Sequence, residues 1–216
     1  MNDGGVPDKV RLPGIRGLYL RPPPEVLFRM NKLIVLVLTV GAIIGGISSS
    51  MAQQHKRISP HEAVSKVIDG NGVTVVYGRP YTKDPTSGQD RKIWGGLVPY
   101  AEVWCTGADE VTLLIIQEPI LIAGTTVPAG AYTLWTLPNQ DGAGKLIINK
   151  QVGQWEVGPG SYDEKQDVVR VDLKKEALDT PVDQFTMEVS KDPSGGGVLR
   201  MMWEKTALSV PFTVQK

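Results

Sequence analysis

The chain has 216 residues, with 23 basic and 23 acidic side chains, two histidines and one cysteine. One cysteine excludes an internal disulfide. The balanced charge, without a block of basic residues, makes the chain a poor candidate for binding nucleic acid or an anionic membrane surface. The length suits one domain once a targeting segment is set aside.

The first 52 residues have the layout of a targeting segment rather than of a folded domain. Residues 1–29 carry arginines and a run of prolines without hydrophobic periodicity, so they are either a non-folded extension or a mis-assigned start that belongs at Met30. Residues 30–52 resemble a secretory signal peptide, in which a basic start precedes the apolar run 33–47 and the small residues of a cleavage site at Ala52. The apolar run is shorter than the roughly 20 residues of a spanning helix. An uncleaved membrane anchor is the alternative.

Cleavage after Ala52 leaves residues 53–216 as one domain with 17 basic and 20 acidic side chains, a net charge of −3. We therefore expect a periplasmic or extracellular protein that is free of the membrane after cleavage and has no nucleic-acid partner. The sequence leaves the oligomeric state open.

The remaining chain consists of short apolar runs separated by glycine and proline turns. Residues 63–68 and 73–77 surround an Asp-Gly-Asn-Gly turn, which is a hairpin signal. We expect a connection at 174–181 and an irregular segment at 152–164. Further strands are expected at 101–106, 111–117, 120–123, 126–127, 131–137, 145–149, 167–173, 185–189, 198–203 and 208–214. About ten short strands without a convincing amphipathic helix predict an all-β fold, an antiparallel β-sandwich or jelly-roll-like domain.

The densest group of functional side chains lies between Tyr77 and Glu110, where four basic and five aromatic residues surround a long loop. Residues 81–99 are expected to be the exposed part, and ordered domains rarely keep so long a loop without a use for it. Aromatic rings beside guanidinium groups suit sugars, carboxylates or aromatic ligands. The candidate ligand-binding residues are Arg79, Tyr81, Lys83, Arg91, Trp94, Asp109 and Glu110. The alternative is that Arg79 pairs internally with Asp109 or Glu110 and that the aromatic rings only pack.

Catalytic and metal-binding candidates are few. A metal site would need His61 and Glu62 to meet Asp109 or Glu110 in space, and no closely spaced ligand cluster points to one. Cys105 is interpreted as a small buried residue rather than a nucleophile. No cofactor is indicated. Four further aromatic residues are expected to pack in the core or at its edge: Tyr132, Trp135, Trp155 and Trp203.

Several ordered motifs of the chain resemble a bacterial family of exported proteins known as domain of unknown function 2911. They are residues 59–62 (SPHE), 77–80 (YGRP), 95–100 (GGLVPY), 103–108 (VWCTGA) and 128–132 (PAGAY), followed by the strand that contains Trp203. This chain departs from the family where Cys105 replaces an arginine, Asp109 replaces an asparagine, and residues 84–90 form an apparent insertion. The resemblance implies a family without an assigned activity, and the lost arginine weakens any anion site built on it.

Three functions remain open from the sequence. The preferred one is non-catalytic binding of a small molecule, a glycan or an envelope partner. The second is a metal-assisted or carboxylate-based hydrolase that uses His61, Glu62, Asp109 and Glu110. The third is a purely structural envelope protein.

Overall fold

The computed structural model describes residues 57–140, 143–155 and 161–215, all of which lie in one compact unit. The predicted extension (1–29) and signal peptide (30–52) lie outside these residues. The strands are β1 (His61–Ile68), β2 (Asn71–Gly78), β3 (Leu113–Ile116), β4 (Ile120–Ile122), β5 (Thr125–Val127), β6 (Gly130–Leu137), β7 (Lys145–Asn149), β8 (Asp167–Asp172), β9 (Lys174–Lys191) and β10 (Gly197–Val214), with a 3-10 turn at Glu164–Gln166. No helix in this part of the chain has the length and hydrophobicity to span a membrane.

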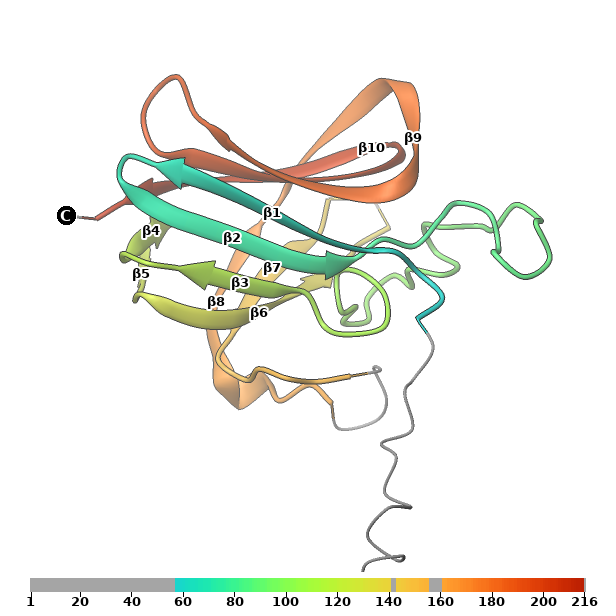
Figure 1. The fold of residues 1–216 in the computed structure, drawn as a ribbon, viewed down its shortest axis with the longest axis horizontal. Helices are drawn as coiled ribbons and strands as arrows, with labels where there is room; N and C mark the ends of the chain where they lie inside the picture. Colours follow the sequence, from blue (N-terminus) through green and yellow to red (C-terminus); the bar gives the residue numbers. More distant parts are fainter. Residues whose placement is uncertain (1–56, 141–142, 156–160, 216) are drawn as a thin grey trace, which may run out of the picture. The chain divides into compact units, whose positions relative to one another are not determined.

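The strands form two antiparallel sheets, which confirms the predicted all-β sandwich. The larger sheet has the order β1-β2-β3-β6-β7-β8, and the smaller has the order β5-β4-β10-β9. Figure 1 shows the two layers, with β9, in orange, beside β1 and β2 of the larger sheet. Apolar side chains of both inner faces fill the space between the layers, as in other sandwiches.

The predicted hairpin is confirmed as β1 and β2. Ile68 pairs with Asn71, so Asp69 and Gly70 form a two-residue turn in which both residues have positive φ, 48° and 92°. This conformation gives a two-residue turn the twist of the strands that it joins. The buried Asn71 side chain then bonds the backbone of Gln117 and Glu118, which fixes the end of β3 beside the turn.

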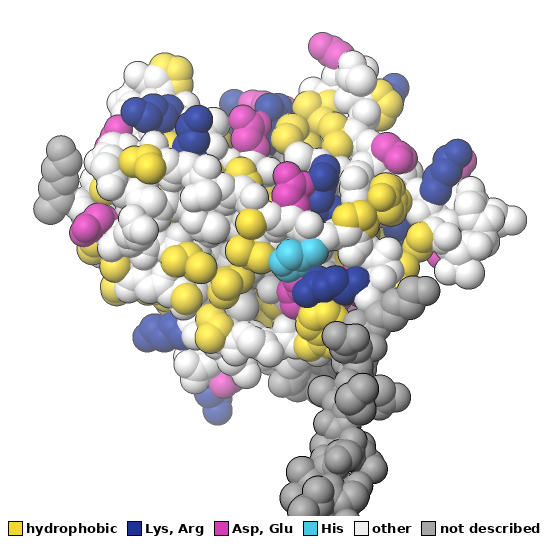
Figure 2. Space-filling model, viewed as in Figure 1, with side chains coloured by type: hydrophobic (Ala, Val, Ile, Leu, Met, Phe, Trp, Pro, Cys, Tyr) yellow, Lys and Arg dark blue, Asp and Glu magenta, His cyan; other side chains and the backbone are white. Residues whose placement is uncertain are grey.

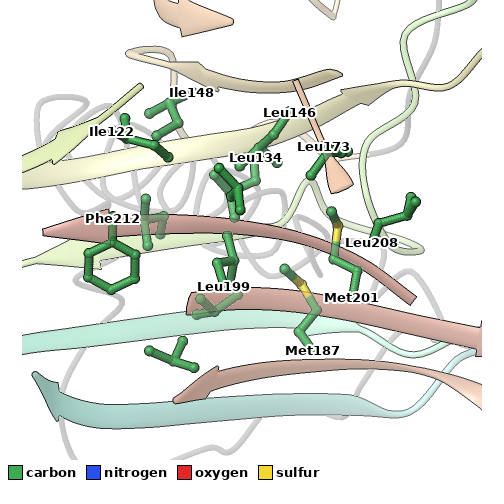
Figure 3. Packing of buried hydrophobic residues seen from close by; sticks show 14 of the residues in the cluster. Ile122, Leu134, Leu146, Ile148, Leu173, Met187, Leu199, Met201, Leu208 and Phe212 are labelled. Carbon is green, nitrogen blue, oxygen red and sulfur yellow. The ribbon is translucent and has the colours of Figure 1, made fainter. Parts of the chain in front are cut away.

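The core lies between the sheets. Figure 3 shows Leu134, Leu146 and Ile148 of the larger sheet facing Met201 and Leu208 of β10. At one end of this core, the ring of Trp203 stacks on that of Trp104, with centroids 6.1 Å apart, and meets the edge of Phe185 at 5.7 Å. These rings join the smaller sheet to the segment that follows the long loop.

Three strand predictions are wrong. Residues 174–181 are not a connection but the first half of β9, which pairs with residues 206–209 of β10. The expected strands 198–203 and 208–214 are one long strand, β10. The expected strand 101–106 makes only an isolated bridge from Trp104 to Thr136, because Ala101 and Thr106 adopt positive φ, which interrupts an extended strand.

The β9–β10 pair contains a large irregularity. Glu204 pairs with Val182 and Thr206 pairs with Ala177, so residues 178–181 of β9 stand opposite Lys205 alone. Glu204 takes a φ of 51°, which is uncommon for a residue other than glycine. Such bulges bend a strand and redirect its side chains. This bend, visible at β9 in Figure 1, shapes the site described next.

Candidate functional site

The long loop has two parts with different surroundings. Residues 83–90 form a short hairpin that projects from the body in Figure 1; it is closed by a bridge between Lys83 and Asp90, and the Asp84 carboxylate accepts from the amides of residues 86 and 87. Those amide bonds lower the pKa of Asp84. The following residues lie on the sandwich instead, and Ile93 and Val98 are buried in its core. The expectation that all of residues 81–99 are exposed is therefore wrong for this second part.

Arg79 is bonded to both sheets. Its guanidinium forms an ion pair with Glu62 of β1 at 2.5 Å and donates to the Phe185 carbonyl at 3.1 Å and the Thr186 hydroxyl at 2.8 Å, both in β9. Its acidic partner is thus Glu62, rather than Asp109 or Glu110 as the alternative interpretation expected. The side chain keeps about a quarter of its surface exposed. Arg79 has the contacts of a structural residue.

We expect Arg79→Ala to lower the free energy of unfolding by about 1–3 kcal/mol, because it removes the ion pair with Glu62 and two hydrogen bonds to β9. Urea unfolding followed by tryptophan fluorescence measures the change. Lys83→Ala is the matched control, since that exposed side chain lies in the same loop, and we expect a change within about 0.5 kcal/mol. Equal effects of the two substitutions would contradict the structural role of Arg79.

The base of the loop is an added strand at the edge of β9. Tyr81 bridges to Gln184, the Phe185 amide donates to the Pro80 carbonyl at 2.9 Å, and the Thr82 amide donates to the Asp183 carbonyl at 2.7 Å. Arg91 stabilises this strand, because its guanidinium donates a hydrogen bond to the Tyr81 carbonyl. The aromatic and basic residues at the base therefore hold the loop in place.

Trp94 packs against the core rather than standing free. Its ring is half-buried and lines a narrow internal void with Trp104, Phe185 and Trp203. Its indole nitrogen is buried, without a hydrogen-bond partner in the described part of the chain. The structure thus gives Arg79, Arg91 and Trp94 different neighbours, while Lys83 is exposed on the hairpin. Ligand binding by this set stays a prediction.

Glu110 lies close to His61, one of the residues proposed for a metal site. Its carboxylate contacts His61 Nδ1 and the guanidinium of Arg57, which in turn lies 4.9 Å above the ring of Trp155. Figure 2 shows the histidine beside basic and acidic side chains. Glu62 instead faces Arg79. Within residues 57–140, 143–155 and 161–215, no three His, Cys, Asp or Glu side chains are grouped to hold a metal ion.

Asp109 and Cys105 lie in the segment that leads into β3. Asp109 has a φ of 66° and one buried carboxylate oxygen without a hydrogen bond to the described residues. Cys105 is buried, as predicted, and packs with Val111, Trp135 and Ile147 on the outer face of the larger sheet. Burial raises the pKa of its thiol to about 11, so the reactive thiolate is scarce at neutral pH. Cys105 therefore has the properties of a packing residue.

A cleft of about 480 Å³ lies where the base of the loop meets the β9–β10 bulge. The residues that line it are Thr82, Pro181, Val182, Asp183, Glu204, Lys205 and Thr206. Of these, only Thr82 belongs to the loop that the sequence singled out. The sequence pattern does not reveal the cleft, because its walls come from a register shift between two long strands. The available signal was the break in alternation after Trp203, where three polar residues separate buried positions.

Glu204 is the unusual side chain of this cleft. Partial burial raises the pKa of its carboxyl group, while its backbone is held at positive φ. No ion pair or hydrogen bond joins the carboxylate to another residue described in the structure. Asp183 lines the same cleft, and its backbone carbonyl accepts hydrogen bonds from the amide and the hydroxyl of Thr82. The cleft thus holds a partly desolvated carboxylate that forms no ion pair with the described residues.

We expect Glu204→Gln to stabilise the protein at pH 7 but not at pH 4. Folding raises the pKa of this carboxyl group, because partial burial disfavours its ionised form. The group therefore destabilises the folded state as the pH rises above the ordinary pKa of glutamate. At low pH the group is protonated in both the folded and unfolded states, so replacing it by a neutral amide changes the stability little. Melting temperatures of both proteins from pH 4 to 8 test this. A stabilisation independent of pH would contradict it.

Comparison with known proteins identifies a family but assigns no activity. No curated protein and no solved structure was found to match the chain. A family model described as Protein of unknown function (DUF2911) matches residues 59–212, which include both strands of the bulge, the whole long loop and the motifs noted in the sequence. The chain therefore belongs to this family of proteins of unknown function.

Proposed function

We propose that this protein is an exported, non-catalytic binding protein, and that a small molecule or a glycan occupies the cleft between the loop base and the β9–β10 bulge. The observation that carries the proposal is the cleft itself. Its volume of about 480 Å³ lies within the range of roughly 300–1,000 Å³ of small-molecule sites. Its wall combines apolar Pro181 and Val182 with carboxylate, ammonium and hydroxyl groups, a mixture that suits an amphipathic ligand.

Binding is preferred to catalysis because of what lines the cleft. Hydrolysis by general acid–base chemistry needs a positioned acid and base at the reacting bond. His61 and Glu110, which do contact each other, are not among the residues that line the cleft. The backbone of Glu204 is held at positive φ at the bulge, and strained residues of this kind gather at ligand sites.

Export rests on the pattern of residues 30–52. A mature protein that begins at Gln53 in N-terminal sequencing supports this part of the proposal. A mature protein that retains the apolar run 33–47 contradicts it and favours the membrane-anchored alternative.

The binding function is tested by filling the cleft. In a thermal-shift screen of sugars, amines and carboxylates, we expect at least one compound to stabilise the wild type and to lose its effect in Thr206→Trp, whose indole ring occupies the cleft. Thr213→Trp is the matched control, an exposed threonine of the same strand outside the cleft. Pro181→Trp is a second cleft-filling variant in case the first does not fold. Hits that bind both cleft variants unchanged place the binding elsewhere and contradict the proposal.

A further inference from the structure

We infer that the ligand of the cleft carries a protonated amine on a short aliphatic body, an inference that rests on the proposed binding function. The cleft contains two carboxylates, those of Asp183 and Glu204, and a single cation, Lys205. Its formal charge is therefore −1. A site with this excess favours a cationic group over an anionic one.

Glu204 provides the first argument. A carboxylate that is partly removed from water without a partner raises the free energy of the folded protein, and a cation that donates hydrogen bonds to it recovers this energy on binding. Protein groups do not supply that cation, since no ion pair of the described residues includes Glu204. Partial burial of the carboxyl group raises the pKa of Glu204. The free protein thus leaves one strong acceptor available in the cleft.

Lys205 does not remove this preference. It follows Glu204 directly in β10 and is exposed, and no salt bridge within 4.0 Å joins the two side chains in this part of the structure. Its ammonium group stands on a flexible stem that can remain in water while a ligand binds. Lys205 therefore attracts anions to the cleft less than Glu204 and Asp183 attract a cation.

The apolar wall provides the second argument, because it restricts the rest of the ligand. Pro181 and Val182 line the cleft together with the two acidic residues, where the β9–β10 register shifts at the bulge. A bare metal ion gains nothing from such a surface, whereas an alkyl chain gains from covering it. A cationic head next to an aliphatic chain matches both features.

Three probes with alkyl chains of the same length separate the contribution of the charged head group from that of the chain: hexylamine, 1-hexanol and hexanoate. Isothermal titration of the full mature protein is expected to show binding of hexylamine at least about tenfold tighter than that of either other probe. Glu204→Gln is expected to weaken hexylamine binding at least about tenfold and to leave 1-hexanol unaffected. Asp183→Asn is a second variant with a smaller effect in the same direction. Glu188→Gln, an exposed glutamate of β9 outside the cleft, is the control and is expected to bind as the wild type does.

The outcomes also distinguish this inference from the proposed function. Binding of hexanoate or 1-hexanol in preference to hexylamine, lost in Thr206→Trp, overturns the amine inference while supporting a binding cleft. Hexylamine binding that survives both Glu204→Gln and Thr206→Trp overturns both. Absence of hexylamine binding at millimolar concentration overturns the amine inference, and the broader screen above then decides the binding function.

Discussion

Trp203→Ala is expected to lower the free energy of unfolding by about 4 kcal/mol, among the largest effects of any single substitution in this protein. The Trp203 side chain is fully buried, and its ring contacts Trp104 and Phe185 where the two sheets meet the segment after the loop. Truncation removes a large apolar surface and leaves a cavity that the rigid strands around it fill only in part. Equilibrium unfolding in urea measures the loss, and an unchanged denaturant dependence shows that the transition itself is preserved.

Two variants accompany this measurement. Trp203→Phe is expected to cost less than the alanine substitution, because most of the ring is kept and the indole nitrogen has no hydrogen-bond partner in the described structure to lose. Met202→Ala is the positional control, a partly exposed neighbour on the same strand. A loss for Trp203→Ala no larger than that for Met202→Ala would show that the aromatic cluster does not hold the sheets together.

Gly78→Ala is expected to destabilise the protein by about 3 kcal/mol or more, because it adds an atom where there is no space for one. A Cβ atom at Gly78 would lie 2.0 Å from the carbonyl oxygen of Ala108 and 2.8 Å from its carbonyl carbon. These are backbone atoms, so the end of β2 or residues 107–109 must move. Because this segment leads to Glu110, we also expect changed chemical shifts around Glu110 and His61 in the folded fraction. Thermal melting and two-dimensional NMR of the variant measure both effects.

Gly72→Ala is the matched control for this prediction, since it adds the same methyl group to the same strand. There the nearest atoms belong to the end of the Gln117 side chain, which can rotate away. We expect a stability within about 1 kcal/mol of the wild type, because alanine also restricts the unfolded chain. If Gly72→Ala is as damaging as Gly78→Ala, strand propensity rather than close backbone contact explains both.

Local patterns were sufficient to predict much of the fold. The Asp69-Gly70 turn fixes the register of β1 and β2, and the alternation of residues 167–173 corresponds to β8. The first half of β9 was missed because its side chains are mostly exposed and include Pro181, which is typical of a connection. Its strand conformation comes from pairing with residues 206–209, and no feature within 174–181 itself encodes that partner.

The candidate site was less predictable, and for two different physical reasons. The ion pair of Arg79 was accessible in principle, because the hairpin places Glu62 opposite Tyr77, two residues from Arg79 and within reach as a diagonal neighbour. The cleft was not accessible, because it depends on how far β9 shifts against β10 at Glu204. Register between strands distant in sequence is set by the packing of the whole sandwich.

The tip of the hairpin formed by residues 83–90 can be replaced without disturbing the packing of the sandwich. Its base is closed by the bridge between Lys83 and Asp90 and by a hydrogen bond from the Asp84 amide to the Gln89 carbonyl, while residues 85–89 are exposed. Replacing the tip therefore leaves the buried Ile93 and Val98 in place. A fluorescent label or a peptide epitope inserted between Thr86 and Gln89 would stand on a hairpin that directly follows Thr82, a residue of the cleft wall. The hairpin thus offers a position for a reporter of ligand binding.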